Sequence, residues 1–226
     1  MLTMIRIFDI FFSSLGLILL LPLFIPVVII LRFSGEGEVF FSQSRVGKSG
    51  KMFDLLKFAT MLKDSPNIGT GTVTIQHDPR ILPIGHMLRK TKVNELPQLL
   101  NVLLGHMSII GPRPQDLRCF EAFPKPSQEQ IIKVRPGLSG IGSIVFRDEE
   151  NIIGGLLDSE FFYDEVIMPY KGKLEEWFVS NDNVLVYFLC IFLTIWIILR
   201  PKSKLFWRVF KDLPQPPKEL VTKLGL

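Results

Sequence analysis

An uncharged apolar run near the start of the chain constrains this sequence more than any other feature. Residues 10–31 read IFFSSLGLILLLPLFIPVVIIL and contain no ionisable side chain. The run is long enough to cross the hydrocarbon core of a bilayer, and it is longer than the apolar part of a signal peptide. We therefore predict that this segment embeds the chain in a membrane.

Two prolines interrupt this run. Pro22 and Pro26 each lack a backbone N–H group and crowd the preceding helical turn, so a straight helix is not expected. Two arrangements stay open: a kinked transmembrane helix, or a re-entrant helix that breaks and leaves through the leaflet by which it entered. We favour the re-entrant form, with Pro22 as a structural turn residue.

A second apolar segment, Val184–Leu199, is short for a membrane span. The chain is basic before this segment and also after it, where the tail carries Arg200, Lys202, Lys204, Arg208 and Lys211. A span would place these two basic regions on opposite sides of the membrane, against the positive-inside tendency. We therefore favour a protein embedded from one side. The second segment then lies in the interface or packs on the domain, and the basic aromatic tail is attracted to anionic lipid.

The charge balance points to an anionic partner. The net charge is +4 and the isoelectric point is about 9.1. The basic residues do not follow one helix and no nucleic-acid-binding motif is present, so we predict no nucleic acid as a partner. The two cysteines and three histidines lack the spacing of a disulfide framework or a zinc site.

The middle of the chain predicts an α+β fold. β-forming residues flank a Gly47-Lys48-Ser49-Gly50 turn and indicate a small β-hairpin. Residues 63–80 are polar and predict a loop, and residues 84–92 predict a short helix. A stripe of leucines and valines after Pro97 predicts an amphipathic helix that ends at Gly105.

These segments divide the chain into three parts. Residues 1–33 form the re-entrant membrane helix, and residues 34–180 form a domain on the cytosolic side with the hairpin and amphipathic helices. Residues 181–226 form an apolar and basic aromatic interfacial segment.

The start of the leucine-rich helix is a candidate anion site. Asn94 fits the N-cap position, Glu95 is a favourable first-turn acid and Pro97 a first-turn proline. A helix start presents free backbone N–H groups and the positive end of the helix dipole. Capping alone, however, explains both Asn94 and Glu95.

Cations on stiff turns could converge on the same anion. Pro112 and Pro114 would hold Arg113 on an extended backbone, and Arg135 precedes a Pro-Gly turn. The remaining candidates are Arg89, Lys90, Lys92 and Arg147. Each arginine taken alone is more simply a solvated or salt-bridged surface residue, whereas several on rigid turns favour phosphate binding. Residues 148–150, Asp-Glu-Glu, are most simply a solvated acidic turn.

One long ordered run carries a family resemblance. LRKTKVNELPQLLNVLLG, followed by HMSIIGPRP and later by RPGLSGIG, resembles the bacterial sugar transferases, which are monotopic polyprenyl-phosphate phosphoglycosyl transferases. The resemblance extends over nearly the whole chain. It implies transfer of a sugar-1-phosphate from a UDP-sugar to undecaprenyl phosphate, with Mg²⁺, at the cytoplasmic face of the bacterial inner membrane. Such transfer initiates a surface polysaccharide or glycoconjugate, and a homo-oligomer is compatible with it.

The resemblance also assigns roles to residues. It implies a catalytic pair at Asn94 and Glu95, with Glu95 as the metal ligand. Lys57, Arg89 and Arg113 match the family pattern and are predicted to bind phosphate and substrate, with Pro112 and Pro114 as structural turn residues. The cations that could converge on the same phosphate add Arg135 and Arg147 to the predicted ligands.

Three positions depart from the family pattern. Asn94 stands where the family has the nucleophilic Asp of an Asp-Glu pair, His106 replaces an Asp, and Ala59 replaces an Arg. An amide is a poor nucleophile and a weak magnesium ligand. Three interpretations stay open: Glu95 is the nucleophile, the chain is inactivated, or lipid phosphate attacks directly without a covalent enzyme intermediate.

Two rival functions remain. One is a catalytically silent membrane module that binds a nucleotide sugar or a partner glycosyltransferase. The other is a small two-span membrane protein unrelated to sugars, which rests only on the apolar segments.

Overall fold

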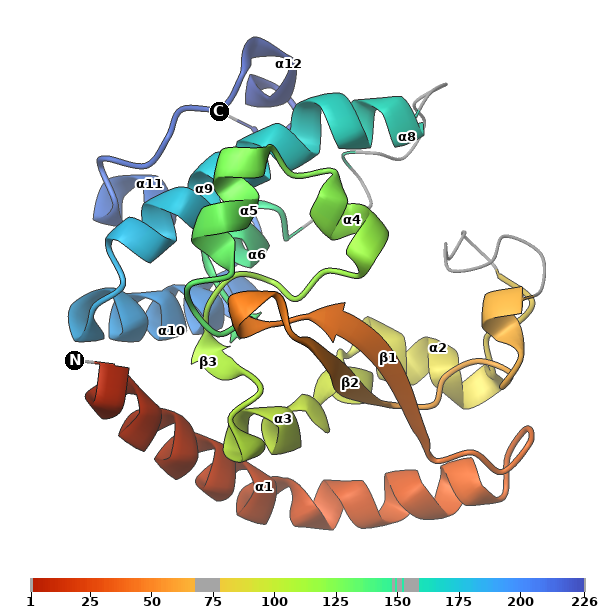
Figure 1. Ribbon diagram of the computed structural model, residues 1–226. Helices are drawn as coiled ribbons and strands as arrows, with labels where there is room; N and C mark the ends of the chain where they lie inside the picture. Colours follow the sequence, from red (N-terminus) through yellow and green to blue (C-terminus); the bar gives the residue numbers. More distant parts are fainter. Residues whose placement is uncertain (1, 68–77, 148, 150–151, 153–158, 226) are drawn as a thin grey trace. The chain divides into compact units, whose positions relative to one another are not determined.

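A computed structural model describes residues 2–67, 78–147, 149, 152 and 159–225 (Figure 1). The described chain forms two compact units. The first unit comprises Met1–Asp9, Arg45–Phe53 and Gly105–Leu226, and the second comprises Ile10–Ser44 and Asp54–Leu104. Helices and short strands occur together in it, which confirms the mixed α and β character expected from the sequence. Most of the polar loop expected at residues 63–80 lies outside the described residues.

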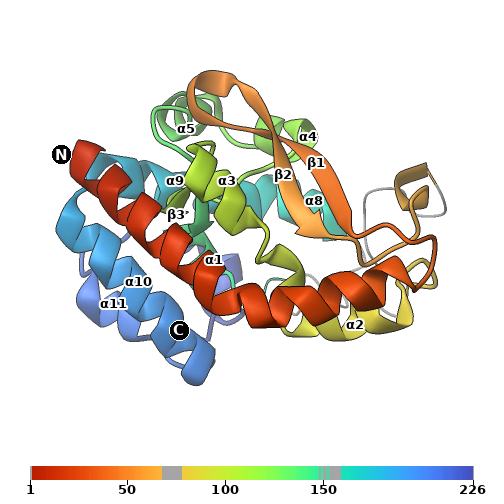
Figure 2. The ribbon, with the colours of Figure 1, turned by 90° about the horizontal axis from the view of Figure 1, so that it is seen from below.

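Helix α1 (Leu2–Arg32) contains the apolar run and is continuous (Figure 2). Pro22 and Pro26 lie inside it and are exposed. The expected break is therefore absent, and Pro22 lies in a helix instead of in a turn. A proline removes one backbone hydrogen bond, and the packing of Val27 and Leu31 on the core beyond the prolines holds the helix together. The segment Met4–Arg32 is long and apolar enough to cross a membrane.

The core of the second unit joins α1 to three other elements. Buried Val27 and Leu31 pack against Phe58 of β2 (Met52–Phe58) and Leu88 of α2 (Pro83–Lys90). Val93 of the 3-10 turn η3 (Val93–Glu95) packs against the same cluster. The aromatic rings of Phe24 and Phe58 meet edge to face, with 5.3 Å between their centroids.

The predicted hairpin is confirmed. β1 (Phe40–Val46) and β2 form a two-stranded sheet, and the turn between them contains the short 3-10 helix η1 (Lys48–Gly50). A short 3-10 helix, η2 (Ser65–Asn67), follows β2. α3 (Gln98–Leu104) is bonded to β2 through Asn101, which accepts from the Leu56 N–H at 2.9 Å and donates to the Asp54 carbonyl at 2.7 Å.

The first unit is built around a parallel pair of short strands. β3 (Ser108–Ile110) pairs with β4 (Gly137–Ser139), with Ser108 opposite Gly137. The other elements of this unit are α4 (Leu117–Glu121), α5 (Lys125–Ile131), α6 (Ile141–Val145), α8 (Ser159–Phe162), the π-helix η4 (Tyr163–Ile167), α9 (Met168–Ser180), α10 (Val184–Leu199), α11 (Leu205–Val209) and α12 (Lys218–Val221). α9 packs on both α5 and α6 (Figure 1).

Helix α10 has two apolar faces with different environments. One face is buried against β3, β4 and α6, and it comprises Val186, Tyr187, Cys190, Leu193 and Ile197. The opposite face is exposed, and it comprises Leu185, Phe188, Phe192, Ile195 and Leu199. The second apolar segment therefore packs on the domain, which is one of the two positions predicted for it from the sequence.

The first turns of α1 lie beside α10 (Figure 2). The rings of Phe8 and Phe188 meet edge to face at 5.0 Å. Asp9 is buried, and its Oδ1 accepts hydrogen bonds from Ser108 Oγ (2.9 Å), the Ile109 N–H (2.9 Å) and the Tyr187 hydroxyl (3.0 Å). One carboxylate in an apolar helix thus joins α1 to β3 and α10.

Candidate active site

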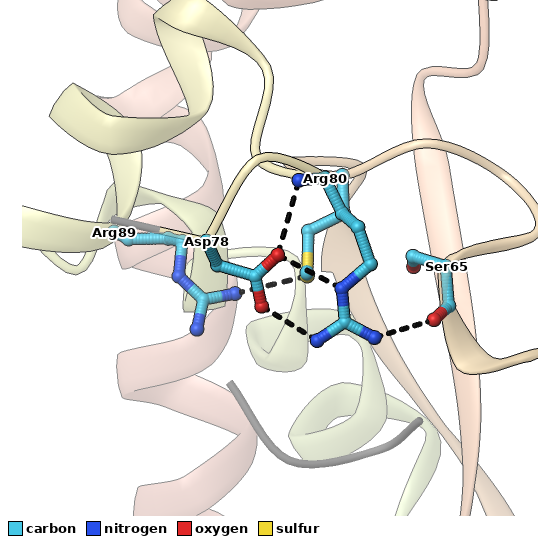
Figure 3. Close-up of polar contacts among 5 residues, drawn as sticks. Ser65, Asp78, Arg80 and Arg89 are labelled. Carbon is cyan, nitrogen blue, oxygen red and sulfur yellow. Dashed lines mark hydrogen bonds and ion pairs between the residues drawn. The ribbon is translucent and has the colours of Figure 1, made fainter. Parts of the chain in front are cut away.

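The C-terminal turn of α2 carries Arg89, a predicted phosphate ligand. The helix lies very close to the preceding segment, because Gly85 has no side chain to collide with the Thr60 carbonyl. Arg89 is half-buried, and its Nη1 lies 3.6 Å from the sulfur of Met61 (Figure 3). Its guanidinium is therefore held at the surface by packing as well as by helix geometry.

A buried ion pair braces the turn that leads into α2 (Figure 3). Arg80 donates from its backbone N–H and its Nε to Asp78 Oδ1, at 3.0 and 2.8 Å. Its Nη1 donates to the Ser65 carbonyl at 2.7 Å. This ion pair was not predicted, although an Asp and an Arg on either side of Pro79 could have indicated it. Its effect is to fix the chain immediately before the helix that carries Arg89.

Asn94 does not cap a helix as we expected. It lies inside η3, which follows Lys92 in the left-handed conformation (φ +60°), and α3 begins only at Gln98. Asn94 is 7% exposed, and its Oδ1 atom is buried without a hydrogen-bond partner among the described residues. Pro97 explains the later helix start, because proline is favoured at the beginning of a helix and not inside it.

The backbone segments of four predicted site residues converge in the second unit. Phe58, Leu88 and Val93 belong to one apolar cluster. They directly adjoin Lys57, Arg89 and Asn94 in the sequence, and Glu95 follows Asn94. Lys57 Nζ lies 3.5 Å from Gln43 Oε1 of the neighbouring strand, and Glu95 is half-buried. Ala59, where the family has an arginine, is buried.

In the first unit, the structure brings the Pro-Arg-Pro and Arg-Pro-Gly turns together. The Gly137 N–H donates to the Pro112 carbonyl at 2.8 Å, and the Gly111 N–H donates to the Ser139 carbonyl at 2.9 Å. A side chain on Gly137 would collide with the backbone of Gly111. The glycines of both motifs are therefore required by close contact between two backbones.

This contact presents Arg113 to solvent. Pro112 and Pro114 are buried, and Arg113 between them is exposed, as expected for an arginine held on a stiff turn. Arg135 is half-buried and donates from Nε to the Gly105 carbonyl at 2.7 Å, so part of its guanidinium is bonded to backbone of the first unit.

A second arginine beside Arg113 was not predicted. Arg45 forms an ion pair with Asp116 at 3.0 Å, and Asp116 also caps α4 by accepting from the Cys119 N–H at 2.8 Å. Burial lowers the pKa of Arg45, and the positive charge of Arg113 adds to this effect. Arg45 therefore contributes to the positive potential around the Pro-Arg-Pro turn.

A buried carboxyl supports the same turn from α9. Glu175 is 3% exposed and accepts a hydrogen bond from the Arg113 backbone N–H. Burial raises the pKa of Glu175 to about 8, against the opposing effects of Lys171 and the Arg113 N–H. Its Oε2 atom has no hydrogen-bond partner among the described residues. No local pattern in the sequence indicates this contact between positions 113 and 175.

Glu149, in the sequence predicted to be a solvated acidic turn, is bonded to a buried cation. Glu149 forms an ion pair with Lys171, which is 5% exposed and also lies over the rings of Phe146 and Tyr163. A buried ammonium needs a nearby carboxylate, and Glu149 supplies it. Residues 148 and 150 lie outside the described residues.

Arg147, the last predicted phosphate ligand, lies elsewhere in the first unit. It is exposed and lines a cavity of about 250 Å³ together with Lys204 and Lys223. The predicted ligands are thus divided between the units: Lys57, Arg89, Asn94 and Glu95 in the second, and Arg113, Arg135 and Arg147 in the first.

A magnesium ion would find few protein ligands here. Over the described ranges, no group of three or more histidines, cysteines and carboxylates could hold a metal. Magnesium often binds through one or two carboxylates together with phosphate oxygens of the substrate. The Glu95 carboxylate, next to the unpartnered Oδ1 of Asn94, fits that minimal set.

Known proteins resemble this chain over most of its length. A family model described as bacterial sugar transferase matches residues 2–201. An exopolysaccharide production protein PSS of Rhizobium leguminosarum bv. phaseoli is 39% identical over 145 residues, which are 62% of this chain and 72% of the relative.

Two further relatives have names that state a reaction. The UDP-glucose:undecaprenyl-phosphate glucose-1-phosphate transferase of Escherichia coli (strain K12) is 37% identical over 138 residues, covering 60% of this chain and 30% of the relative. A putative undecaprenyl-phosphate N-acetylgalactosaminyl 1-phosphate transferase of Bacillus subtilis (strain 168) is 43% identical over 110 residues, covering 49% of this chain and 61% of the relative.

Proposed function

Because the chain belongs to the bacterial sugar transferase family, we propose that it transfers a sugar-1-phosphate from a UDP-sugar to undecaprenyl phosphate. This reaction initiates exopolysaccharide or capsule synthesis, and we place it at the cytoplasmic face of the bacterial inner membrane. The observation that carries the proposal is the Pro-Arg-Pro turn. Two buried prolines and the Gly137 contact fix a backbone whose only exposed side chain in that tripeptide is Arg113.

The arginines are suited to bind phosphate groups of the substrates. The guanidinium groups of Arg113 and Arg89 match phosphate oxygens in geometry and charge, the first on a rigid turn and the second packed against Met61. Lys57 adds positive charge in the second unit, and Arg135 adds it in the first. Neutralising the phosphate oxygens lowers the barrier to attack by an anionic nucleophile.

Glu95 supplies the carboxylate at which the sugar phosphate is transferred. A carboxylate oxygen attacks the phosphorus that carries the sugar, and the bond from this phosphorus to the uridine monophosphate oxygen breaks. A phosphate oxygen of undecaprenyl phosphate then attacks the same phosphorus and releases Glu95 as a carboxylate. Two displacements replace one, and no acid or base must change protonation state overall.

Magnesium, when bound by Glu95 with the donor phosphates, would screen the charge of the pyrophosphate. Asn94 precedes Glu95 in the chain, and its amide oxygen accepts no hydrogen bond from the described residues. The amide could therefore orient a donor group of the substrate, or a water, next to Glu95.

The transfer reaction is tested with purified full-length protein in detergent. It is incubated with undecaprenyl phosphate, magnesium and a panel of radiolabelled UDP-sugars, with an active member of the family run alongside. We expect label in the lipid fraction for one of the sugars. If every sugar leaves the lipid fraction unlabelled while the other enzyme is active, the proposal fails.

Asn94 favours a second candidate function. If the missing carboxylate at this position abolishes turnover, the chain would bind a UDP-sugar or a partner glycosyltransferase without transferring sugar. Equilibrium binding of a UDP-sugar at micromolar concentrations, with no labelled lipid formed, would distinguish this module from the enzyme.

A further inference from the structure

A cavity in the first unit is formed in large part by the C-terminal tail. Its volume is about 250 Å³, and we call it the tail pocket. It is lined by Ile144, Val145, Arg147, Ile152, Ile197, Pro201, Lys204, Phe206, Lys223 and Leu224. The family model ends at residue 201, so four of these residues lie beyond the part of the chain that the family model matches.

Three cations converge on the tail pocket. Arg147 follows α6, Lys204 precedes α11 and Lys223 follows α12. None of the described lining residues is acidic. Lys223 also donates to the Ile152 carbonyl at 3.3 Å and lies over the ring of Phe162. Three positive charges around one cavity repel one another unless an anion is bound between them.

The remaining lining is apolar. Four buried side chains, between 2 and 7% exposed, form an apolar floor of the cavity: Ile144, Ile152, Ile197 and Phe206. A free inorganic anion would gain nothing from such a floor, whereas an amphiphile with one phosphate and an apolar body would use both parts.

The surroundings of the tail pocket extend this apolar floor. Ile197 belongs to the C-terminal end of α10, and Pro201 follows this helix. The outer side chains Ile195, Ile198 and Leu199 of the helix are 54, 58 and 71% exposed. A lipid chain that leaves the cavity can therefore continue along an apolar helix face. The volume lies just below the roughly 300–1,000 Å³ of whole small-molecule sites, so it suits a headgroup better than a nucleotide sugar.

We propose that the tail pocket binds the phosphate group of an anionic lipid. Lys204 and Lys223 hold the phosphate with Arg147, and the apolar floor holds the first part of the lipid body. The site is distinct from the phosphate-binding residues proposed above, and Arg147 belongs to this site and not to those residues.

The proposal is tested by titrating lipid into full-length protein in neutral detergent micelles. The ligands are phosphatidylglycerol, phosphatidylcholine, undecaprenyl phosphate and inorganic phosphate, and the readouts are the apparent dissociation constant and the thermal unfolding midpoint. The test variant is K204Q/K223Q, which removes two charges from the pocket. The control is K202Q/K211Q, which removes the same charge from exposed tail lysines outside the pocket lining.

We expect phosphatidylglycerol to bind and phosphatidylcholine not to bind. K204Q/K223Q should weaken binding by about tenfold or more, since each lysine contributes a charge-assisted hydrogen bond, and the control should change it by less than about twofold. Equal losses in both variants, or no loss in either, would overturn the proposal. Inorganic phosphate that binds as tightly as lipid would also overturn it.

Undecaprenyl phosphate identifies which lipid occupies the site. If it binds more tightly than phosphatidylglycerol and depends on the same two lysines, the pocket holds the acceptor lipid. If it binds no more tightly, the pocket holds bulk membrane lipid. No UDP-sugar is present in this titration, so failure of lipid binding and failure of sugar transfer are separate results.

Discussion

At the scale of single residues, two buried polar side chains are only partly hydrogen-bonded. Asn94 and Glu175 each have an oxygen atom without a hydrogen-bond partner among the described residues. A buried oxygen without a hydrogen bond raises the free energy of the folded state. Such atoms are therefore expected where a ligand or a bound proton supplies the missing hydrogen bond. Asn94 lies beside the proposed nucleophile, and Glu175 lies under the backbone of a proposed phosphate ligand.

Asn94→Asp tests which carboxylate reacts. If Asn94 replaces a lost nucleophile, the new carboxylate should raise the turnover number for sugar transfer by about tenfold or more, because a carboxylate attacks phosphorus and an amide does not. Our assignment of Glu95 predicts instead no gain or a loss, and Glu95→Gln should then abolish labelling of the lipid. A large gain in Asn94→Asp would contradict the role of Glu95.

Glu175→Gln tests the buried carboxyl. The pKa of Glu175 is raised to about 8 from 4.5, so the folded state binds its proton more tightly than the unfolded state. This contribution to stability is complete below pH 4.5 and is lost as the pH rises to about 8, by about 1 kcal/mol per pH unit. We expect the unfolding midpoint of Glu175→Gln to exceed that of the parent at pH 8 and to decline less with pH.

The exposed Glu165 provides the control for this measurement. Glu165→Gln should follow the parent protein across the whole pH range. If Glu175→Gln and the parent lose stability in parallel between pH 5 and 8, Glu175 is not the titrating group.

At the scale of elements, side chains that bond to the backbone of another element hold the candidate site in place. Asn101 of α3 bonds both a donor and an acceptor of β2, and Arg80, shortly before α2, bonds the Ser65 carbonyl of η2. Because α3 directly follows the Asn94-Glu95 turn, the position of that turn depends on the contact between α3 and β2.

Asn101→Ala should therefore destabilise the protein without touching substrate. Asn101 is 1% exposed, and its loss removes the partner of the Leu56 N–H and of the Asp54 carbonyl in β2. We expect a loss of about 1–3 kcal/mol in the free energy of unfolding, measured by denaturant titration in detergent. Asn67→Ala, at an exposed asparagine, is the control and should be close to neutral. A neutral Asn101→Ala would show that α3 does not depend on this contact.

Several of these elements could be predicted from local sequence patterns. The contacts between residues far apart in the sequence could not. The hairpin followed from β-forming residues around a glycine turn, and the end of α3 followed from Gly105, which has φ +89°. The contacts of Glu175 with position 113 and of Asp9 with position 187 join residues whose neighbours show no common pattern. The expected cap at Asn94 was wrong because Lys92 begins a separate 3-10 turn before Pro97.

At the scale of the whole molecule, the proposed function requires the catalytic residues and the basic tail to lie on one side of the membrane. One face of α10 is packed on β3, β4 and α6, and its position relative to the bilayer stays a prediction. The length and composition of α1 allow it to cross a membrane, and whether it crosses or re-enters stays a prediction.

Cysteine labelling tests the sidedness. Cys119 is replaced by Ser, the buried Cys190 is kept, and single cysteines are introduced at Ser49 in the hairpin turn and at Lys202 in the tail, both exposed. We expect a membrane-impermeant maleimide to label both positions only from the cytoplasmic face of sealed inner-membrane vesicles. Labelling of the two positions from opposite faces would show that α10 spans the membrane.

The buried carboxylate of Asp9 also has a consequence for biogenesis. Asp9 is synthesised before Tyr187, because the tyrosine whose hydroxyl bonds it lies 178 residues further along the chain. At roughly 5–20 residues per second, the carboxylate waits about 9–36 s for its last partner. A carboxylate that lacks part of its native hydrogen-bond set is costly in lipid. We therefore expect the N-terminal end of α1 to reach its final position only after α10 has been synthesised and Tyr187 can bond Asp9.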